Sequence, residues 1–165
     1  MVEQMNNLDP LRWAKFFASI KHQNQLYGTG LPYTHHLAAV EGVLRRFNVI
    51  EDTMLNAAWL HDVVEDTNTK VKEIAEMFGE EVAILVAAVT NEPGENRKVR
   101  AALTYPKIRN TKGAVCLKLA DRIANVEHGG KLVDMYKREY EDFRRALYTK
   151  DEYENMWVHL DALLK

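Results

Sequence analysis

Apolar residues recur three and four positions apart along nearly the whole chain, which is the spacing of an amphipathic helix. The first such stretch begins at Asp9-Pro10, a cap followed by a proline at the first helical position, and it fades by Gly28. No run alternates apolar and polar residues for long enough to require a strand. The pattern therefore predicts an all-α fold, a single-domain multi-helix bundle.

Capping residues, glycines and prolines set the boundaries of the other expected helices. These helices are expected at about 34–47, 53–66, 70–78, 80–90, 97–105, 114–125, 131–148 and 151–164. Pro106 and Gly113 separate two of them, and Gly129-Gly130 breaks the chain again. No linker is long enough to divide the chain, so we expect one domain over residues 1–165, with its core at about 10–126 and C-terminal helices at 131–164.

Composition and charge narrow the class of protein. The 165 residues include 22 basic and 24 acidic side chains, a net charge of −2, which argues against nucleic acid as a partner. The chain start lacks a basic and apolar signal region, and no run reaches the roughly 18 apolar residues of a membrane span, so we expect a cytoplasmic protein without a membrane partner. Cys116 lies in an apolar run and is expected to be a buried thiol.

The most informative polar feature is the run of residues 60–67, Leu-His-Asp-Val-Val-Glu-Asp-Thr. His61 and Glu65 are four positions apart, as are Asp62 and Asp66, so on one continuous helix they share a sector. Three carboxylates at a helix C-terminus repel one another and the helix dipole, which costs stability unless a cation lies among them. A solvated acidic helix end is the alternative, but His61-Asp62 on the buried flank favours a cation site.

Two other expected helices offer partners for that cation. His35 stands at an expected helix start, and its alternative role is that of a core or capping histidine. Asp121 shares a helix face with Lys118 and Asn125, and its alternative role is a salt bridge with Lys118 or Arg122. The combined ligand set is His35, His61, Asp62 and Asp121. Two imidazoles and two carboxylates neutralise a divalent cation and leave positions for water or substrate, and ligands without thiolate favour manganese or iron over structural zinc.

The order His, His-Asp, Asp resembles the HD phosphohydrolase superfamily. The flanking residues resemble the hydrolase domain of the RelA/SpoT homologue family, in particular the stand-alone small alarmone hydrolases. The matching stretches are Pro32-Tyr33-Thr34-His35 with Val40, His61-Asp62-x-x-Glu65-Asp66-Thr67, Phe78-Gly79-x-x-Val82 leading to Val89-Thr90, and Lys118-Leu119-Ala120-Asp121-Arg122-x-x-Asn125, within roughly residues 13–126. The resemblance implies a manganese-dependent hydrolase that removes the 3′-pyrophosphate of ppGpp or pppGpp. No synthetase region follows, so hydrolysis without synthesis is expected.

The resemblance also implies roles for single residues. The metal ligands would be His35, His61, Asp62 and Asp121, and the acidic pair that orients or deprotonates the attacking water would be Glu65 and Asp66. The nucleotide contacts would be Asn125 at the ribose, Lys21 near the phosphates and Tyr140 at the 5′-phosphates. Charge alone makes Lys118, Arg97, Lys98 and Arg100 further candidates for phosphate binding.

The sequence departs from the family pattern in two places. Ile20 stands where the family carries an arginine that stacks on guanine, and His36 stands where a proline commonly follows the first ligand. The missing arginine leaves open an HD hydrolase acting on another nucleotide, such as a deoxynucleoside mono- or triphosphate. A nucleotide sensor that does not cleave is a second alternative, against which the complete ligand set and the Glu65-Asp66 pair argue. A homo-oligomer is also left open, because the sequence does not define the oligomeric state.

Overall fold

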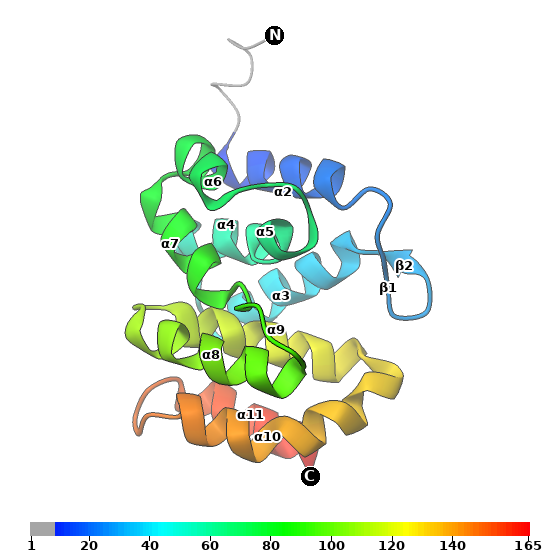
Figure 1. Cartoon of the computed structure of the whole chain (residues 1–165), viewed down its shortest axis with the longest axis vertical. Helices are drawn as coiled ribbons and strands as arrows, with labels where there is room; N and C mark the ends of the chain where they lie inside the picture. Colours follow the sequence, from blue (N-terminus) through cyan, green and yellow to red (C-terminus); the bar gives the residue numbers. More distant parts are fainter. Residues whose placement is uncertain (1–8) are drawn as a thin grey trace, which may run out of the picture.

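A computed structural model describes residues 9–165 and confirms the all-α architecture (Figure 1). The helices are α2 (Pro10–Lys21), α3 (Thr34–Arg46), α4 (Asp52–Leu60), α5 (Val63–Asp66), α6 (Val71–Phe78), α7 (Glu80–Val89), α8 (Arg97–Asn110), α9 (Ala114–His128), α10 (Val133–Leu147) and α11 (Glu154–Leu164). Within residues 9–165, the remaining regular structure is β1 (Leu26–Tyr27), β2 (Leu31–Pro32) and the 3₁₀ turn η1 (Gly130–Leu132). The chain start, on which the expectation of no signal region depends, lies outside the described residues.

The helices stack along the long axis of the molecule. In Figure 1, α2 and α6 lie at one end, α3, α4 and α7 in the middle, and α10 and α11 at the other end. Helix α9 packs against both α3 and α11, so it lies between the middle layer and the C-terminal helices. No helix within the described range is long and apolar enough to cross a membrane.

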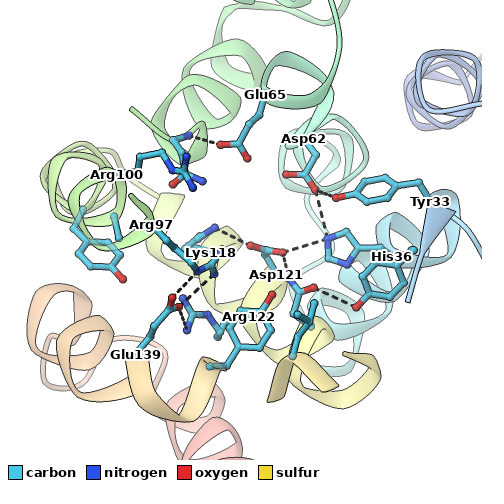
Figure 2. A pocket seen from close by; sticks show the side chains of 17 residues that line it. Tyr33, His36, Asp62, Glu65, Arg97, Arg100, Lys118, Asp121, Arg122 and Glu139 are labelled. Carbon is cyan, nitrogen blue, oxygen red and sulfur yellow. Dashed lines mark hydrogen bonds and ion pairs between the residues drawn. The ribbon is translucent and has the colours of Figure 1, made fainter. Parts of the chain in front are cut away.

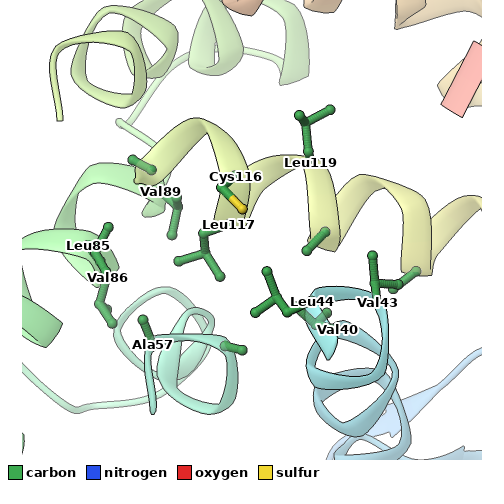
Figure 3. Close-up of a cluster of buried hydrophobic side chains, with 14 of the residues drawn as sticks. Val40, Val43, Leu44, Ala57, Leu85, Val86, Val89, Cys116, Leu117 and Leu119 are labelled. Carbon is green, nitrogen blue, oxygen red and sulfur yellow. The ribbon is translucent and has the colours of Figure 1, made fainter. Parts of the chain in front are cut away.

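Helix α9 is the centre of the hydrophobic core. Leu117, Ala120 and Ala124 share its packing face and are fully buried. Figure 3 shows this helix above Val40 and Leu44 of α3, beside side chains of α7. Because other helices cover α9 on several sides, its polar side chains also lie in or near the interior, and that placement sets up the site described below.

Cys116 lies in the same core, as expected from its apolar neighbours. It is a free, buried cysteine whose Sγ lies 3.9 Å from Sδ of Met156. Burial raises the pKa of its thiol to about 12, so the thiol stays protonated at neutral pH.

The expected helix over 53–66 is interrupted in the structure. Helix α4 ends at Leu60 and α5 begins at Val63, with His61 and Asp62 in the turn between them. Both residues nevertheless keep backbone angles in the right-handed helical region. Their side chains both reach the same interior site, with His61 Nε2 2.9 Å from Asp62 Oδ2. The expectation of one continuous helix was wrong at these two residues.

The expected end of a second helix was also wrong. The helix expected to stop at Tyr105 continues through Pro106 to the end of α8. A proline inside a helix removes the hydrogen bond to the carbonyl four residues earlier, here that of Ala102, and both residues lie on the exposed side where water reaches that carbonyl. The buried side chains of Thr104 and Ile108 hold the other face of the helix in place.

The glycine-rich loop after α2 forms a short hairpin that the sequence pattern does not reveal. Leu26 pairs with Pro32 and Tyr27 with Leu31 in an antiparallel ladder. Gly30 in the turn has φ +105°, a conformation that side chains with a Cβ rarely adopt. Strands of two residues are too short to show alternation, yet this hairpin carries Tyr27 to the candidate site.

Candidate metal centre and active site

Two imidazoles and two carboxylates from three parts of the chain meet at one buried point. His36 Nε2 on α3 lies 3.5 Å from Asp62 Oδ2 and 3.2 Å from Asp121 Oδ1 on α9. His61 Nε2 lies 2.9 Å from the same Asp62 oxygen and 3.6 Å from the same Asp121 oxygen. Ligand atoms of His36, His61 and Asp62 all lie within 4.8 Å of one another, close enough to share a metal ion.

The structure brings His36, and not His35, to this point. Neighbouring helical residues point about 100° apart, and the burial of Val40 and Leu44 fixes which face of α3 turns inward. His36 lies four positions before Val40 on that face and is 1% exposed, whereas His35 is exposed and lines a different cavity with His128. His36 therefore lies in the cluster where His35 was expected, one residue further along the chain.

Hydrogen bonds outside the cluster orient its members. The distance from His61 Nδ1 to the Ala58 carbonyl oxygen is 2.7 Å, so Nδ1 donates there and Nε2 faces the carboxylates. The Tyr33 hydroxyl donates to Asp62 Oδ2 at 2.6 Å. The ring of Tyr27 stacks on His36 with centroids 4.9 Å apart.

The donor set fits a divalent cation. His36 Nε2 and His61 Nε2 face each other at 3.4 Å, and when both rings carry their proton on Nδ1 the two lone pairs have no hydrogen to share. A cation between them satisfies both nitrogens and neutralises the carboxylates of Asp62 and Asp121.

Charges within the cluster oppose the effect of burial on its pKa values. Burial would lower the pKa of His61, but the charge of Asp62 and hydrogen bonds with Asp62 and Asp121 raise it well above its ordinary value. Burial would raise the pKa of Asp121, but the Lys118 ammonium and hydrogen bonds from His36 and His61 hold it well below its ordinary value. Asp121 therefore stays ionised at neutral pH, as a metal ligand requires.

The cluster forms one side of a cavity of about 290 Å³. Figure 2 shows His36 and Asp62 on one side, Asp121 in the middle, and a group of basic side chains facing them. The basic side chains that line the cavity are Arg97, Arg100, Lys118 and Arg122. A cavity with a cation site on one side and basic side chains on the other fits an anionic ligand that also binds metal.

The two members of the expected acidic pair lie in different places. Glu65 lines the cavity, and its Oε1 accepts a hydrogen bond from the Asn91 backbone N–H at 2.9 Å. Asp66 does not line the cavity and accepts from Gln25 Nε2 at 2.8 Å, and burial raises its pKa. Because neighbouring side chains of a helix point about 100° apart, only Glu65 of this pair faces the cavity.

The expected nucleotide contacts also divide into two groups. Asn125 and Lys118 line the cavity, and both donate to Asp121, at 2.7 and 2.8 Å. Lys21 does not line it and holds its Nζ 5.2 Å from the ring centroid of Phe17. Tyr140 does not line it either, because its hydroxyl hydrogen-bonds Asp161 where α10 meets α11. Sequence reasoning missed Tyr27, Tyr136 and Glu139, which also line the cavity.

Comparison with known proteins agrees with this geometry. The family described as HD domain matches residues 14–150. The chain belongs to this HD domain family. Membership implies a divalent metal, and His36, His61 and Asp62 are residues that could bind one.

Several relatives of this HD domain protein carry names that state an activity. It is 39% identical over 115 residues to a guanosine-3′,5′-bis(diphosphate) 3′-pyrophosphohydrolase of Aquifex aeolicus, covering 67% of this chain and 16% of that protein. It is 35% identical over 116 residues to the enzyme of that name called MESH1 in Danio rerio, covering 67% of this chain and 63% of that protein. The chain thus spans less than two thirds of either relative.

Solved structures of similar fold include two with high coverage. One is described as a metazoan orthologue of SpoT that hydrolyses ppGpp and plays a role in starvation responses, with a TM-score of 0.82 at 25% identity and 94% coverage of both chains. Another is a protein of Listeria monocytogenes EGD-e, with a TM-score of 0.66 at 26% identity, covering 79% of this chain and 96% of that one. Both likenesses agree with the all-α bundle.

Proposed function

We propose that this chain is a metal-dependent hydrolase that removes the 3′-pyrophosphate of ppGpp or pppGpp. The observation that carries the proposal is a single cavity with a cluster of metal-binding side chains on one side and four basic side chains on the other. The named activity of the relatives supports this choice of substrate. A small nucleotide is then the partner, and the cytoplasmic location expected from the sequence belongs to the same proposal.

The metal in this proposal is manganese, held by His36, His61, Asp62 and Asp121. Nitrogen and oxygen ligands without thiolate suit this ion. When bound, a divalent cation lowers the pKa of a coordinated water and polarises a phosphoryl oxygen. The second carboxylate oxygen of Asp121 is held by Lys118, so this ligand keeps a fixed orientation toward the cavity.

Glu65 is the proposed base for the attacking water. Its carboxylate lines the cavity, and the bond from the Asn91 backbone N–H leaves its second oxygen available to accept a proton. Asp66 acts indirectly, because its carboxylate accepts a hydrogen bond from Gln25 Nε2, and Gln25 Oε1 in turn lies 2.7 Å from His22 Nδ1. Asp66 thereby orients the segment that carries Glu65 and does not take the proton itself.

The basic side of the cavity holds the phosphates that are not cleaved. Arg97 and Arg100 supply donors that match phosphate oxygens, Arg122 adds a buried positive charge beside them, and Asn125 also lines the cavity. Ile20 is 48% exposed and does not line the cavity, so its side chain is not part of the phosphate site. A substrate panel tests the base preference.

The test is a panel of substrates offered to the purified, manganese-loaded protein. We expect pyrophosphate release from ppGpp and pppGpp, and loss of turnover in Asp62→Ala. Turnover of deoxynucleoside mono- or triphosphates alone would contradict the proposed substrate and favour another HD hydrolase. Nucleotide binding without any turnover would contradict the enzymatic role and favour a sensor.

A further inference from the structure

Arg122, Glu139 and Arg97 form a series of contacts along the basic side of the cavity. Arg122 on α9 is buried, with its guanidinium 4.7 Å from the ring centroid of Tyr136 and 4.3 Å from that of Phe143. Its Nη1 lies 3.5 Å from Oε2 of Glu139 on α10. Contacts with two rings leave the buried guanidinium little freedom, so Arg122 is a fixed positive charge beside Glu139.

Glu139 in turn holds Arg97, the first residue of α8. The Arg97 Nε donates to Glu139 Oε1 at 2.5 Å, and its Nη2 donates to Oε2 at 3.3 Å. A guanidinium has five N–H donors, so this contact takes two on one edge and leaves three for a ligand. The opposite edge of Arg97 is thus free to bind a phosphate in the cavity that it lines.

The exposed fraction of the side chains decreases from Arg97 through Glu139 to Arg122. The exposed fraction is 47% for the Arg97 side chain, 27% for Glu139 and 5% for Arg122. Arg97 follows directly on the loop of residues 91–96, so it has little backbone support of its own on that side. An arginine without support loses side-chain entropy when it binds an anion, and a bound carboxylate removes part of that cost beforehand.

Glu139 is an unexpected residue in a site that binds phosphates, because a carboxylate repels them. Its negative charge must be neutralised by cations. If Arg97 were the only cation, its pair with Glu139 would leave no net positive charge for a phosphate. Arg122 supplies a second positive charge, so the group of three keeps a net charge of +1 facing the cavity. Arg122 Nη1 has no hydrogen-bond partner among the described residues, so its contact with Glu139 is one of charge.

We propose that Arg122 is a positioning residue for phosphate binding, which acts through Glu139 to hold Arg97 in its binding orientation. The inference rests on the proposed function for the identity of the nucleotide, but the contacts that carry it require only an anionic ligand. It assigns Arg97 the direct phosphate contact and gives Arg122 and Glu139 the task of orienting it.

The test compares Arg97→Ala, Arg122→Met and the double variant with the wild type, all loaded with manganese. Methionine keeps an apolar chain against the two rings but removes the charge. Two quantities are measured, the KM for ppGpp and the dissociation constant of GDP by calorimetry, since GDP carries the 5′-phosphates that remain after 3′-pyrophosphate removal. We expect each single variant to raise the KM for ppGpp and the dissociation constant of GDP by about tenfold. The kcat should stay within twofold of the wild-type value, and the metal content should be unchanged.

The decisive result is the double variant. If Arg122 acts only through Arg97, the double variant binds no more weakly than Arg97→Ala alone. The matched control is Arg144→Met, because Arg144 is also stacked on aromatic rings, 4.3 Å from Tyr148, and paired with Asp161, but lies away from the cavity. We expect this control to leave KM and the dissociation constant unchanged.

The outcomes separate this inference from the proposed function. Additive losses in the double variant, an equal loss in Arg144→Met, or no change in Arg122→Met would overturn the inference even if ppGpp is hydrolysed. Wild-type protein that binds GDP but hydrolyses no ppGpp would refute the proposed function, and the dissociation constants would still decide the inference. Wild-type protein that does not bind GDP would overturn the inference as well.

Discussion

Glu65 and Asp66 show how one residue of displacement changes a chemical role. Both carboxylates belong to the same short helix, yet Glu65 lines the cavity and Asp66 turns away to Gln25. The same holds for His36 and His35, which are neighbours on α3 but face different cavities. At this scale function follows from the direction of a side chain more than from its type.

We predict that Glu65→Gln keeps the metal and lowers kcat by roughly 10²- to 10⁴-fold, the usual contribution of a general base. The amide is similar in size to the carboxylate and can still accept the hydrogen bond from Asn91, but it cannot take a proton. The matched variant Asp66→Asn should lower kcat much less, because this side chain does not line the cavity. Kinetics beside metal analysis checks both, and a larger loss in Asp66→Asn would show that the proton acceptor is misassigned.

At the scale of helices, Glu41 is the polar residue that joins three of them. This buried carboxylate of α3 lies 2.8 Å from Lys15 Nζ on α2 and accepts from Trp59 Nε1 on α4 at 2.7 Å and from Arg45 Nε at 2.8 Å. Burial would raise the pKa of Glu41, but the hydrogen bonds from Lys15, Trp59 and Arg45 outweigh it and lower the pKa. A lowered pKa means that the charged form stabilises the folded state.

We predict that Glu41→Gln lowers the free energy of unfolding at pH 7 by about 1–3 kcal/mol, because two cations lose a buried partner. The folded pKa lies below the unfolded value of about 4.3, so this stability is present above that value and is lost as the pH falls through the folded pKa. Denaturant titrations at several pH values check it. Glu76→Gln, which removes an exposed pair with Lys72, should change stability by less than about 0.5 kcal/mol. A deficit in Glu41→Gln that persists at pH values below the folded pKa would contradict this account.

The helices themselves could be predicted from the sequence to different degrees. Apolar spacing predicted α9, and the positions of Lys118, Asp121 and Asn125 on one face of it were also readable. The turn at His61 and Asp62 was not readable, because no glycine or proline marks it and apolar residues continue on both sides. Such an interruption is set by tertiary contacts, which local patterns do not record.

At the scale of the whole molecule, the site depends on three distant parts of the chain. Helix α3, the turn between α4 and α5, and helix α9 each supply side chains to the cluster, and the packing of α3 on both α4 and α9 brings them together. Sequence spacing predicted that three helices converge but could not fix the rotation of α3. That rotation follows from burial of Val40 and Leu44, and it decides which histidine faces the cluster.

The central claim is that His36, His61, Asp62 and Asp121 share one ion. The most direct measurement is the manganese content per protein molecule of the wild type, His36→Ala and His35→Ala, determined by atomic emission after removal of free metal. The account predicts an equal content in the wild type and His35→Ala, and loss of the ion in His36→Ala. Loss of the ion in His35→Ala with retention in His36→Ala would contradict the account.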